Sequence, residues 1–250
     1  MLFLFIKLLK HKNTYFWNTN SHKLTMKNLF LFLSFLFFNQ LLSQKKYHFD
    51  YVFSVKESYK LKDEKLNSVF LVNSKLNNLH LYAHESADSL QYYLHFKDEN
   101  GVAFNANMNK SDFDKFETIS TTCDKVTKFK NPYVDKRKEY EFVNYSDTLI
   151  NNISYYHYAI KCNKNLKYQK RKKIVTTHYI VDKSDANFLP FTYLSTIYET
   201  WKISKNIPNG YPKTIFFINA DGKETGRMEF IKVTKVDKYA IIPDECDFTK

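Results

Sequence analysis

The stretch LLSQKKYHFDYVFSV, Leu41 to Val55, joins an apolar run to a segment with a period of two. Its second half carries an apolar or aromatic residue at alternate positions: Tyr47, Phe49, Tyr51, Phe53 and Val55. This alternation is typical of a β-strand with one buried face, so we predict a strand whose alternate side chains face the core. The residues between them, predicted to lie on the more solvated side, are His48, Asp50, Val52 and Ser54.

The apolar run before this strand has the three parts of a secretory signal. Lys27 precedes the run Leu29–Leu42, and Ser43 follows it. A basic start, an apolar run of about a dozen residues and a small residue near its end are what such a signal requires. The run is shorter than the roughly 20 apolar residues that cross a bilayer. We therefore predict cleavage after Ser43 or Gln44; a membrane protein anchored by this run and by Met1–Leu9 is the alternative.

These features predict three segments. Residues 26–43 form the signal peptide, with Met26 as the true start. Residues 1–25 are an upstream over-extension of the reading frame, disordered or absent. Residues 45–250 form a single β-rich domain, because no Pro/Ser/Gly-rich linker divides them and their length suits one domain.

The period of two continues through most of residues 45–250. Short strands joined by hairpin turns form antiparallel sheets by default. We predict a mainly β fold, a single curved antiparallel sheet or incomplete barrel of about 9–11 strands with one or two short helices. We expect one face of the sheet to bury aromatic side chains, with the helices on that face.

Turn and helix signals divide the strands. The Asn100-Gly101 step predicts a tight hairpin, because both residues tolerate positive φ. A loop is predicted at SDTLINN, residues 146–152. The spacing of apolar residues predicts a helix over 190–203, which begins at a proline. A second, short helix is predicted over 111–117, with Ser111 as its cap.

The net charge of +12 does not by itself indicate a nucleic-acid partner. Of the 38 basic residues, the only arginines are Arg137, Arg171 and Arg227. Bidentate recognition of phosphates and bases favours arginine over lysine. We therefore predict no nucleic-acid binding and interpret most of the charge as a solvated lysine surface.

The densest basic segment is KCNKNLKYQKRKK, Lys161–Lys173, with seven basic residues in thirteen. One interpretation is a solvated hairpin loop kept open by charge repulsion. The other is a contact with an anionic envelope surface, where each lysine near lipid phosphates contributes about 1 kcal/mol. Both interpretations remain open from the sequence.

The three cysteines are Cys123, Cys162 and Cys246. In an oxidising compartment they predict one disulfide and one free thiol, and the sequence does not say which two pair. Cys162 shares a predicted strand face with Tyr158 and Ile160, so we expect it to be a buried apolar residue.

No residue pattern predicts chemistry. His80 and His84 lack a third ligand, and we interpret them, with Tyr82, as the solvated face of a strand whose buried face is Leu79, Leu81 and Ala83. The four glycines are too scattered to form a phosphate loop. We predict no catalytic residue, no metal and no cofactor, and no binding residues are assigned.

The segment PNGYPKTIFFINADGKETGRMEFIKVTKVDKYAIIP, Pro208–Pro243, is similar to the closing part of LolA-like periplasmic lipoprotein-carrier and lipid-binding proteins. In both, a Gly/Pro turn leads into a hairpin with an Asp-Gly tip, and a final proline ends the segment. The resemblance implies a strongly curved sheet with helices across its concave side and a cavity for acyl chains or apolar ligands. Carrier activity in that family depends on an arginine facing the cavity, and none of the three arginines is predicted there. The whole chain also resembles small exported proteins of unknown function from Gram-negative bacteria.

Together these observations predict an exported, periplasmic or secreted protein of the Gram-negative envelope. Its predicted role is non-enzymatic, the binding of a lipid or other apolar ligand in the concavity of the sheet. The alternatives are a structural or interaction protein of the envelope or cell surface that acts through its lysine-rich loops, and an enzyme of unknown type.

Overall fold

The computed structural model describes residues 44–60, 64–86, 90–184 and 186–249. The predicted signal peptide, residues 26–43, and the predicted over-extension, residues 1–25, lie outside these residues. Within the described part, none of the helices is long and apolar enough to cross a membrane.

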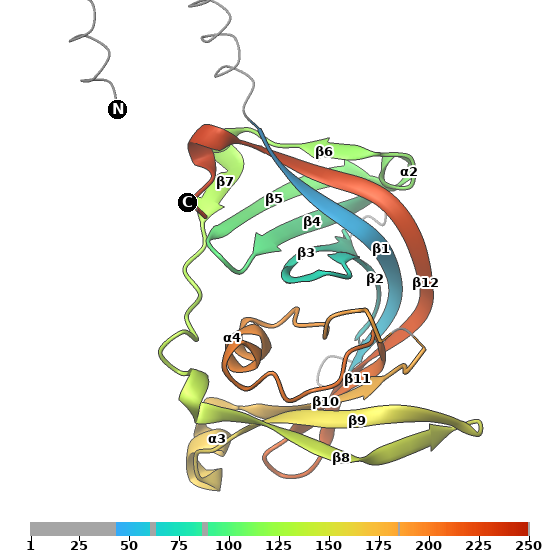
Figure 1. The fold of residues 1–250 in the computed structure, drawn as a ribbon, viewed down its shortest axis with the longest axis vertical. Coiled ribbons are helices and arrows are strands. Elements are labelled where there is room, and N and C mark those ends of the chain that lie inside the picture. The colour runs from blue at the N-terminus through green and yellow to red at the C-terminus, as the bar shows by residue number, and fades with distance from the viewer. Residues whose placement is uncertain (1–43, 61–63, 87–89, 185, 250) are drawn as a thin grey trace, which may run out of the picture. The chain divides into compact units, whose positions relative to one another are not determined.

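A single curved sheet of twelve strands forms the domain (Figure 1). In chain order the strands are β1 (Gln44–Tyr59), β2 (Glu64–Asn73), β3 (Leu76–Glu85), β4 (Gln91–Asp98), β5 (Val102–Asn109), β6 (Thr118–Ser120), β7 (Val126–Lys128), β8 (Tyr140–Ile150), β9 (Ile153–Cys162), β10 (Val175–Val181), β11 (Pro212–Asn219) and β12 (Glu224–Pro243). Their spatial order is β7-β5-β4-β3-β2-β1-β12-β11-β10-β9-β8, and β6 pairs with β12 off this path. The β6–β12 pair is parallel and the other pairs are antiparallel.

The predicted mainly β, antiparallel fold is confirmed. The described residues contain twelve strands, one more than the largest number predicted, because β6 and β7 are only three residues long and carry little periodicity. The α-helices among them are α2 (Lys110–Phe113), α3 (Leu166–Lys172) and α4 (Ser195–Ser204).

The predicted helix boundaries need correction. Helix α4 begins at Ser195, not at Pro190, because Phe191 packs against the rings of Phe53 and Phe70 and holds residues 190–194 in an irregular path. Helix α2 has four residues instead of the predicted seven, and its cap position is Asn109 instead of Ser111.

The loop predicted over residues 146–152 is mostly strand. Strand β8 continues to Ile150, which pairs with Ile153. The turn consists of Asn151 and Asn152, with φ of 51° and 64°. Two consecutive positive φ angles are what a two-residue hairpin turn requires, and asparagine tolerates them.

The sheet packs side chains on both of its faces. The first core includes Tyr47, Phe49, Leu71, Leu81, Phe96 and Phe104. The second core includes Phe53, Phe70, Tyr158, Tyr179, Phe191 and Phe230. Neighbouring residues such as Phe70 and Leu71 therefore belong to different cores, and the prediction that one face is buried is wrong for β2 and β3.

Strand β1 contributes to both cores, and its pairing with β12 is irregular where it passes from one to the other. Phe49 pairs with Lys238 and Tyr51 with Lys235, so β12 has one extra residue between these pairs. Such a bulge bends the strand and increases its twist. Phe49 lies in the first core and Phe53 in the second, although both occupy alternate positions of the same strand, and the irregular pairing falls between them.

The predicted burial along β1 is otherwise confirmed, with two exceptions. Four of the five alternate residues are buried, and the fifth, Tyr51, is half-buried. Val52, predicted to lie on the more solvated side, packs against the first core.

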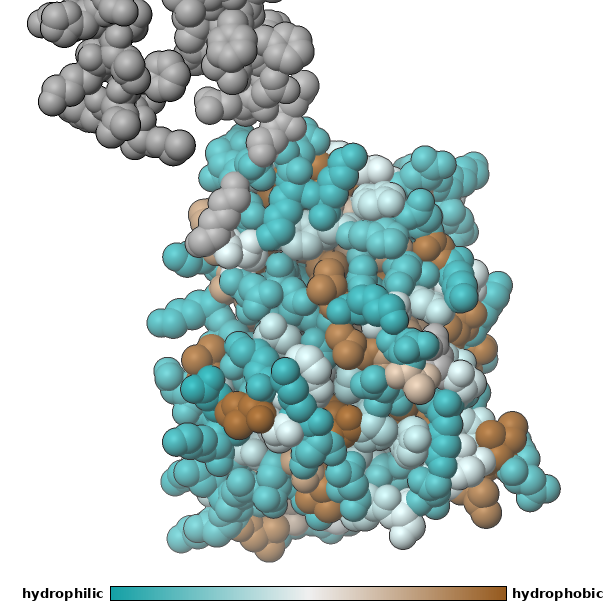
Figure 2. All heavy atoms as spheres, in the orientation of Figure 1, coloured by the Kyte–Doolittle hydropathy of each residue, from teal (hydrophilic) through white to brown (hydrophobic). Residues whose placement is uncertain are grey.

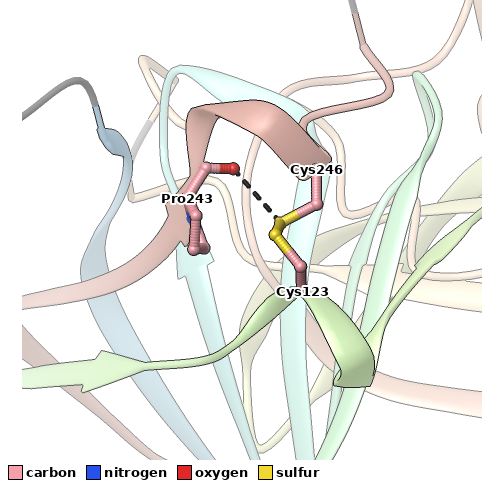
Figure 3. The surroundings of a disulfide bond; sticks show 3 residues. All are labelled: Cys123, Pro243 and Cys246. Carbon is pink, nitrogen blue, oxygen red and sulfur yellow. Dashed lines mark hydrogen bonds between the residues drawn. A yellow bond between two sulfur atoms is a disulfide. The ribbon is translucent and has the colours of Figure 1, made fainter. Parts of the chain in front are cut away.

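The first core is enclosed by a short connection. Strand β6 lies beside β12 and strand β7 beside β5, at opposite ends of this half of the sheet, and only residues 121–125 join them. A disulfide links Cys123 in this connection to Cys246, which follows β12 (Figure 3). Cys162 is free and buried. The predicted combination of one disulfide and one buried thiol is confirmed, and the pairing is now assigned.

Candidate functional site

The sheet curves around the chain segment that leads into α4 (Figure 1). Side chains of this segment and of the strands line a cavity of about 460 Å³. It is lined by Glu57, Tyr59, Phe70, His80, Tyr82, His95, Lys97, Val175, Thr177, Tyr193, Leu194, Phe217 and Met228. These residues come from seven strands, β1 to β4 and β10 to β12, and from the segment before α4. The volume falls in the range of roughly 300–1,000 Å³ that is usual for small-molecule sites.

Glu57 is the buried acid of the cavity, with a relative exposure of 3%. Its Oε2 accepts a hydrogen bond from the hydroxyl of Tyr59 at 2.6 Å, and its Oε1 accepts from Tyr82 at 3.0 Å and from Ser68. Among the described residues all of its donors are hydroxyls, and it takes part in no ion pair. A buried carboxylate therefore faces the cavity with hydrogen bonds but without a cationic partner.

Aromatic rings surround this carboxylate. Phe70 lies 4.8 Å from Tyr82 and 5.6 Å from Tyr193, measured between ring centroids, and Tyr59 stacks on Phe217. Burial raises the pKa of the Tyr193 phenol well above its usual value of 10.0, and its neighbours, Glu57 among them, act in the same direction. The Tyr193 hydroxyl contacts the thioether sulfur of Met228 at 3.3 Å, a weak acceptor.

At the β4 side of the cavity, the positive charge of Lys97 is neutralised by Glu99. The ammonium of Lys97 lies 2.6 Å from Oε1 of Glu99, and both Lys97 and Glu99 bond to the Ser195 hydroxyl at 3.0 Å. Burial is the main cause that raises the pKa of Glu99, and Lys97 opposes this shift. Asn131 donates to both Glu99 and Glu199, so this polar network fastens α4 to the sheet.

His80 is a neutral wall residue of the cavity. It is 5% exposed, and burial lowers the pKa of its imidazole well below the usual 6.5, with the nearby charge of Lys97 acting in the same direction. The interpretation of this face of β3 as solvated is therefore wrong for His80, which faces the enclosed concave side; Leu79, Leu81 and Ala83 are buried on the opposite face as predicted.

We expect the stability of the protein to fall as the pH is lowered below 6.5, in part through His80. The folded state holds this imidazole neutral, whereas the unfolded chain protonates it below pH 6.5, so unfolding takes up a proton. The expected loss is about 1.4 kcal/mol per pH unit until the lowered pKa is reached. Urea unfolding between pH 5 and 8 should show a shallower dependence for His80→Gln. Burial also lowers the pKa of His157, and it lowers that of His178 to about 4, so both add slopes of the same sign in both proteins. Parallel curves for the two proteins below pH 6.5 would contradict this role.

Two other residues considered in the sequence, His84 and Cys162, are not among the residues that line the cavity. The ring of His84 stacks on that of Tyr82 at 5.3 Å and lies tilted against that of Tyr93 at 5.4 Å, measured between centroids. Cys162 lies buried at the end of β9, as expected from the sequence. Within the described ranges, no group of three or more His, Cys, Asp or Glu is placed to hold a metal ion.

The basic segment 161–173 is not the hairpin loop considered in the sequence analysis, because it contains α3. Asn165 caps this helix by accepting a hydrogen bond from the backbone N–H of Tyr168, which begins a helix inside the charged segment. Lys170 pairs with Asp221 across 2.5 Å, and Lys172 and Lys173 are exposed.

None of the three arginines lines the cavity. Arg227 pairs with Glu224 and lies over the ring of Phe216, next to the cavity residues Met228 and Phe217 but on the other face of their strands. Arg137 and Arg171 belong to a 3-10 turn and to α3. The cavity-facing arginine expected of a LolA-like carrier is therefore missing from the cavity wall.

Glu57 was not among the predicted site residues, although the alternation of β1 contains a signal for it. Glu57 continues the alternation of Phe53 and Val55 in β1, so its side chain lies on a face that is otherwise apolar. A charged residue at a core position of a strand is an exception that calls for a partner or a function.

No protein-family model matches the chain, and no curated protein matches it in sequence. Solved structures similar to it include an uncharacterized conserved protein from Thermus thermophilus, with a TM-score of 0.41 and 7% identity over 75% of this chain and 79% of that one. MucB of Pseudomonas aeruginosa, in its complex with MucA, gives a TM-score of 0.39 and 6% identity over 78% of this chain and 54% of that one. The LolA superfamily protein NE2245 from Nitrosomonas europaea gives 0.28 and 11% over 79% and 88%. The predicted LolA-like resemblance is thus confirmed among solved structures, and at these scores it assigns no ligand or activity.

Proposed function

We propose that the protein is an exported, non-catalytic binding protein of the bacterial envelope that holds a small amphiphilic molecule in the concave cavity. The observation that carries this proposal is the cavity of about 460 Å³, with five aromatic rings of Phe and Tyr in its wall. We propose an amphiphilic ligand instead of a purely apolar one, because the same wall contains a buried carboxylate and two histidines. Pockets with a mainly apolar wall and a few polar groups bind molecules that have both kinds of surface.

Export is part of this proposal. It rests on the signal pattern of residues 26–43 and on the disulfide between Cys123 and Cys246, since disulfides persist in oxidising compartments. Residues 45–250 are proposed as the mature domain.

The outer surface favours the cavity as the binding site. On the face seen in Figure 2, hydrophobic side chains lie in small separate groups among hydrophilic ones. Large contiguous apolar patches, which mark docking surfaces, do not stand out on that face. The alternative partner, an anionic envelope surface, is supported only by the exposed basic residues of α3.

Mass spectrometry of the full-length gene product, purified from the cell envelope, tests the proposal. Under denaturing conditions the mass should correspond to a chain that begins at Gln44 or Lys45. Under native conditions a fraction of the protein should carry a bound small molecule. In a Thr177→Trp variant, whose indole would fill part of the cavity, the bound fraction should fall about ten-fold or more.

The matched control is Thr176→Trp. Thr176 is the neighbour of Thr177 in β10 and lies on the opposite face of the strand, paired with Ile218 instead of the cavity residue Phe217. This variant should retain the bound molecule. Equal occupancy in both variants, or a bare polypeptide mass in the unmodified protein at every purification, would overturn the proposal.

A further inference from the structure

The cavity has an unusual charge arrangement. Glu57 carries a negative charge, Lys97 is neutralised by Glu99, and burial keeps His80 uncharged. Of the acidic and lysine side chains that line the cavity, Glu57 is therefore the one whose charge no opposite charge within the described residues offsets. A buried carboxylate in this situation favours a cation from outside the chain.

The carboxylate also has unused hydrogen-bonding capacity. A carboxylate offers about four acceptor positions. Two hydrogen bonds reach Oε1, from Ser68 and Tyr82, and one reaches Oε2, from Tyr59. Oε2 can therefore accept one further hydrogen bond, and an N–H of a ligand is a suitable donor.

The rings around Glu57 supply the second element of cation recognition. Tyr59, Tyr82 and Tyr193 line the same cavity as Glu57, and Phe70 lies within ring contact of two of them. Aromatic faces attract cations within about 6 Å, most strongly in sites shielded from water. Val175, Leu194 and Met228 form apolar wall at other points of the cavity.

We propose that the cavity binds an organic cation, a molecule with an ammonium group and an apolar body, and that Glu57 accepts a hydrogen bond from the ammonium. This inference rests on the proposed binding function and specifies the chemical class of the ligand. It distinguishes the site from a cavity for free fatty acids, whose carboxylate would be repelled by Glu57.

Calorimetric titration of the full-length protein with three probes of equal chain length tests the inference. The probes are n-octylammonium, n-octanol and octanoate. We expect n-octylammonium to bind about ten-fold or more tightly than the other two, the preference that one hydrogen bond to a charged group provides. In Glu57→Gln this preference should disappear, while the affinity for n-octanol changes by less than about two-fold. The control Glu229→Gln, at an exposed position of β12, should keep the full preference.

The possible results separate the two proposals. Tighter binding of octanoate or n-octanol than of n-octylammonium by the unmodified protein overturns the cation inference and leaves the binding function intact. Loss of binding of all three probes in Thr177→Trp supports the cavity as their site. Absence of binding of every probe to the unmodified protein counts against both. Because the comparison among probes uses the unmodified protein, it decides the question even if Glu57→Gln does not fold.

Discussion

Replacement of both Cys123 and Cys246 by serine is expected to lower the free energy of unfolding by about 2–5 kcal/mol. The two cysteines are 123 residues apart in the sequence. In the chain-entropy description, a bond that closes a loop of about 100 residues removes roughly 4.7 kcal/mol of freedom from the unfolded chain. The bond also holds the connection between β6 and β7 against the end of β12, where the sulfur of Cys246 lies 3.2 Å from the carbonyl oxygen of Pro243 (Figure 3). Its loss should therefore loosen the enclosure of the first core as well.

Denaturation in urea, followed by circular dichroism with and without a reducing agent, measures this effect. The reducing agent should bring the wild type to the stability of the double-serine variant and should leave that variant unchanged, which makes the variant its own control. Thiol titration of the oxidised, unfolded wild type should find one free thiol, that of Cys162. Three free thiols, or an unfolding free energy that differs by less than about 0.5 kcal/mol from the variant's, would refute the pairing or its contribution.

The sequence predicted the elements whose signals are local. The β-branched residues of β10 predict that strand, and the Asp-Gly turn predicts the hairpin of β11 and β12. The predicted loop between β8 and β9 begins too early, because the polar residues 146–148 are typical of a loop. In the structure, cross-strand pairing extends β8 to Ile150. Pairing with a neighbouring strand is a tertiary contribution that a local pattern does not contain.

The sequence of β2 contains a signal for burial on both of its faces. Val69, Phe70, Leu71 and Val72 are consecutive apolar residues, and such an unbroken run is typical of a strand covered on both sides. The change of face along β1, in contrast, coincides with an irregularity in its pairing with β12, and β12 begins more than 160 residues further along the chain. No window of the sequence contains both partners.

The candidate site was less predictable than the fold for the same reason. Glu57, His80 and Thr177 meet only because the sheet curves until β10 faces β3 and β4 across the cavity. In the sequence these three residues belong to separate strands, β1, β3 and β10. Their shared enclosure is a property of the curvature, which no single strand encodes.

Replacement of Phe53 by alanine is expected to lower the free energy of unfolding by about 3–5 kcal/mol, the range for a buried phenylalanine. Phe53 is fully buried in the middle of β1. Its ring lies 5.6–6.0 Å from four other rings, those of Phe188, Phe191, Tyr211 and Phe230. Phe188 and Phe191 belong to the segment before α4, Tyr211 directly precedes β11, and Phe230 lies in β12. The alanine variant would leave a void that none of these rings can fill without leaving its other partners.

Guanidinium unfolding followed by circular dichroism should show a graded response at this position. Phe53→Leu, which keeps most of the volume, is expected to cost less than about 1.5 kcal/mol, because swaps that nearly conserve volume are tolerated. Leu149→Ala removes a comparable side chain from a position that is 71% exposed in β8 and should change the stability by less than about 0.5 kcal/mol. If the Phe53→Ala cost were instead as small as that of Leu149→Ala, the ring could not join the segment before α4 to the sheet. The cavity beside it would then lack the rigid wall that selective binding requires, since this one ring contacts both the sheet and the segment that covers it.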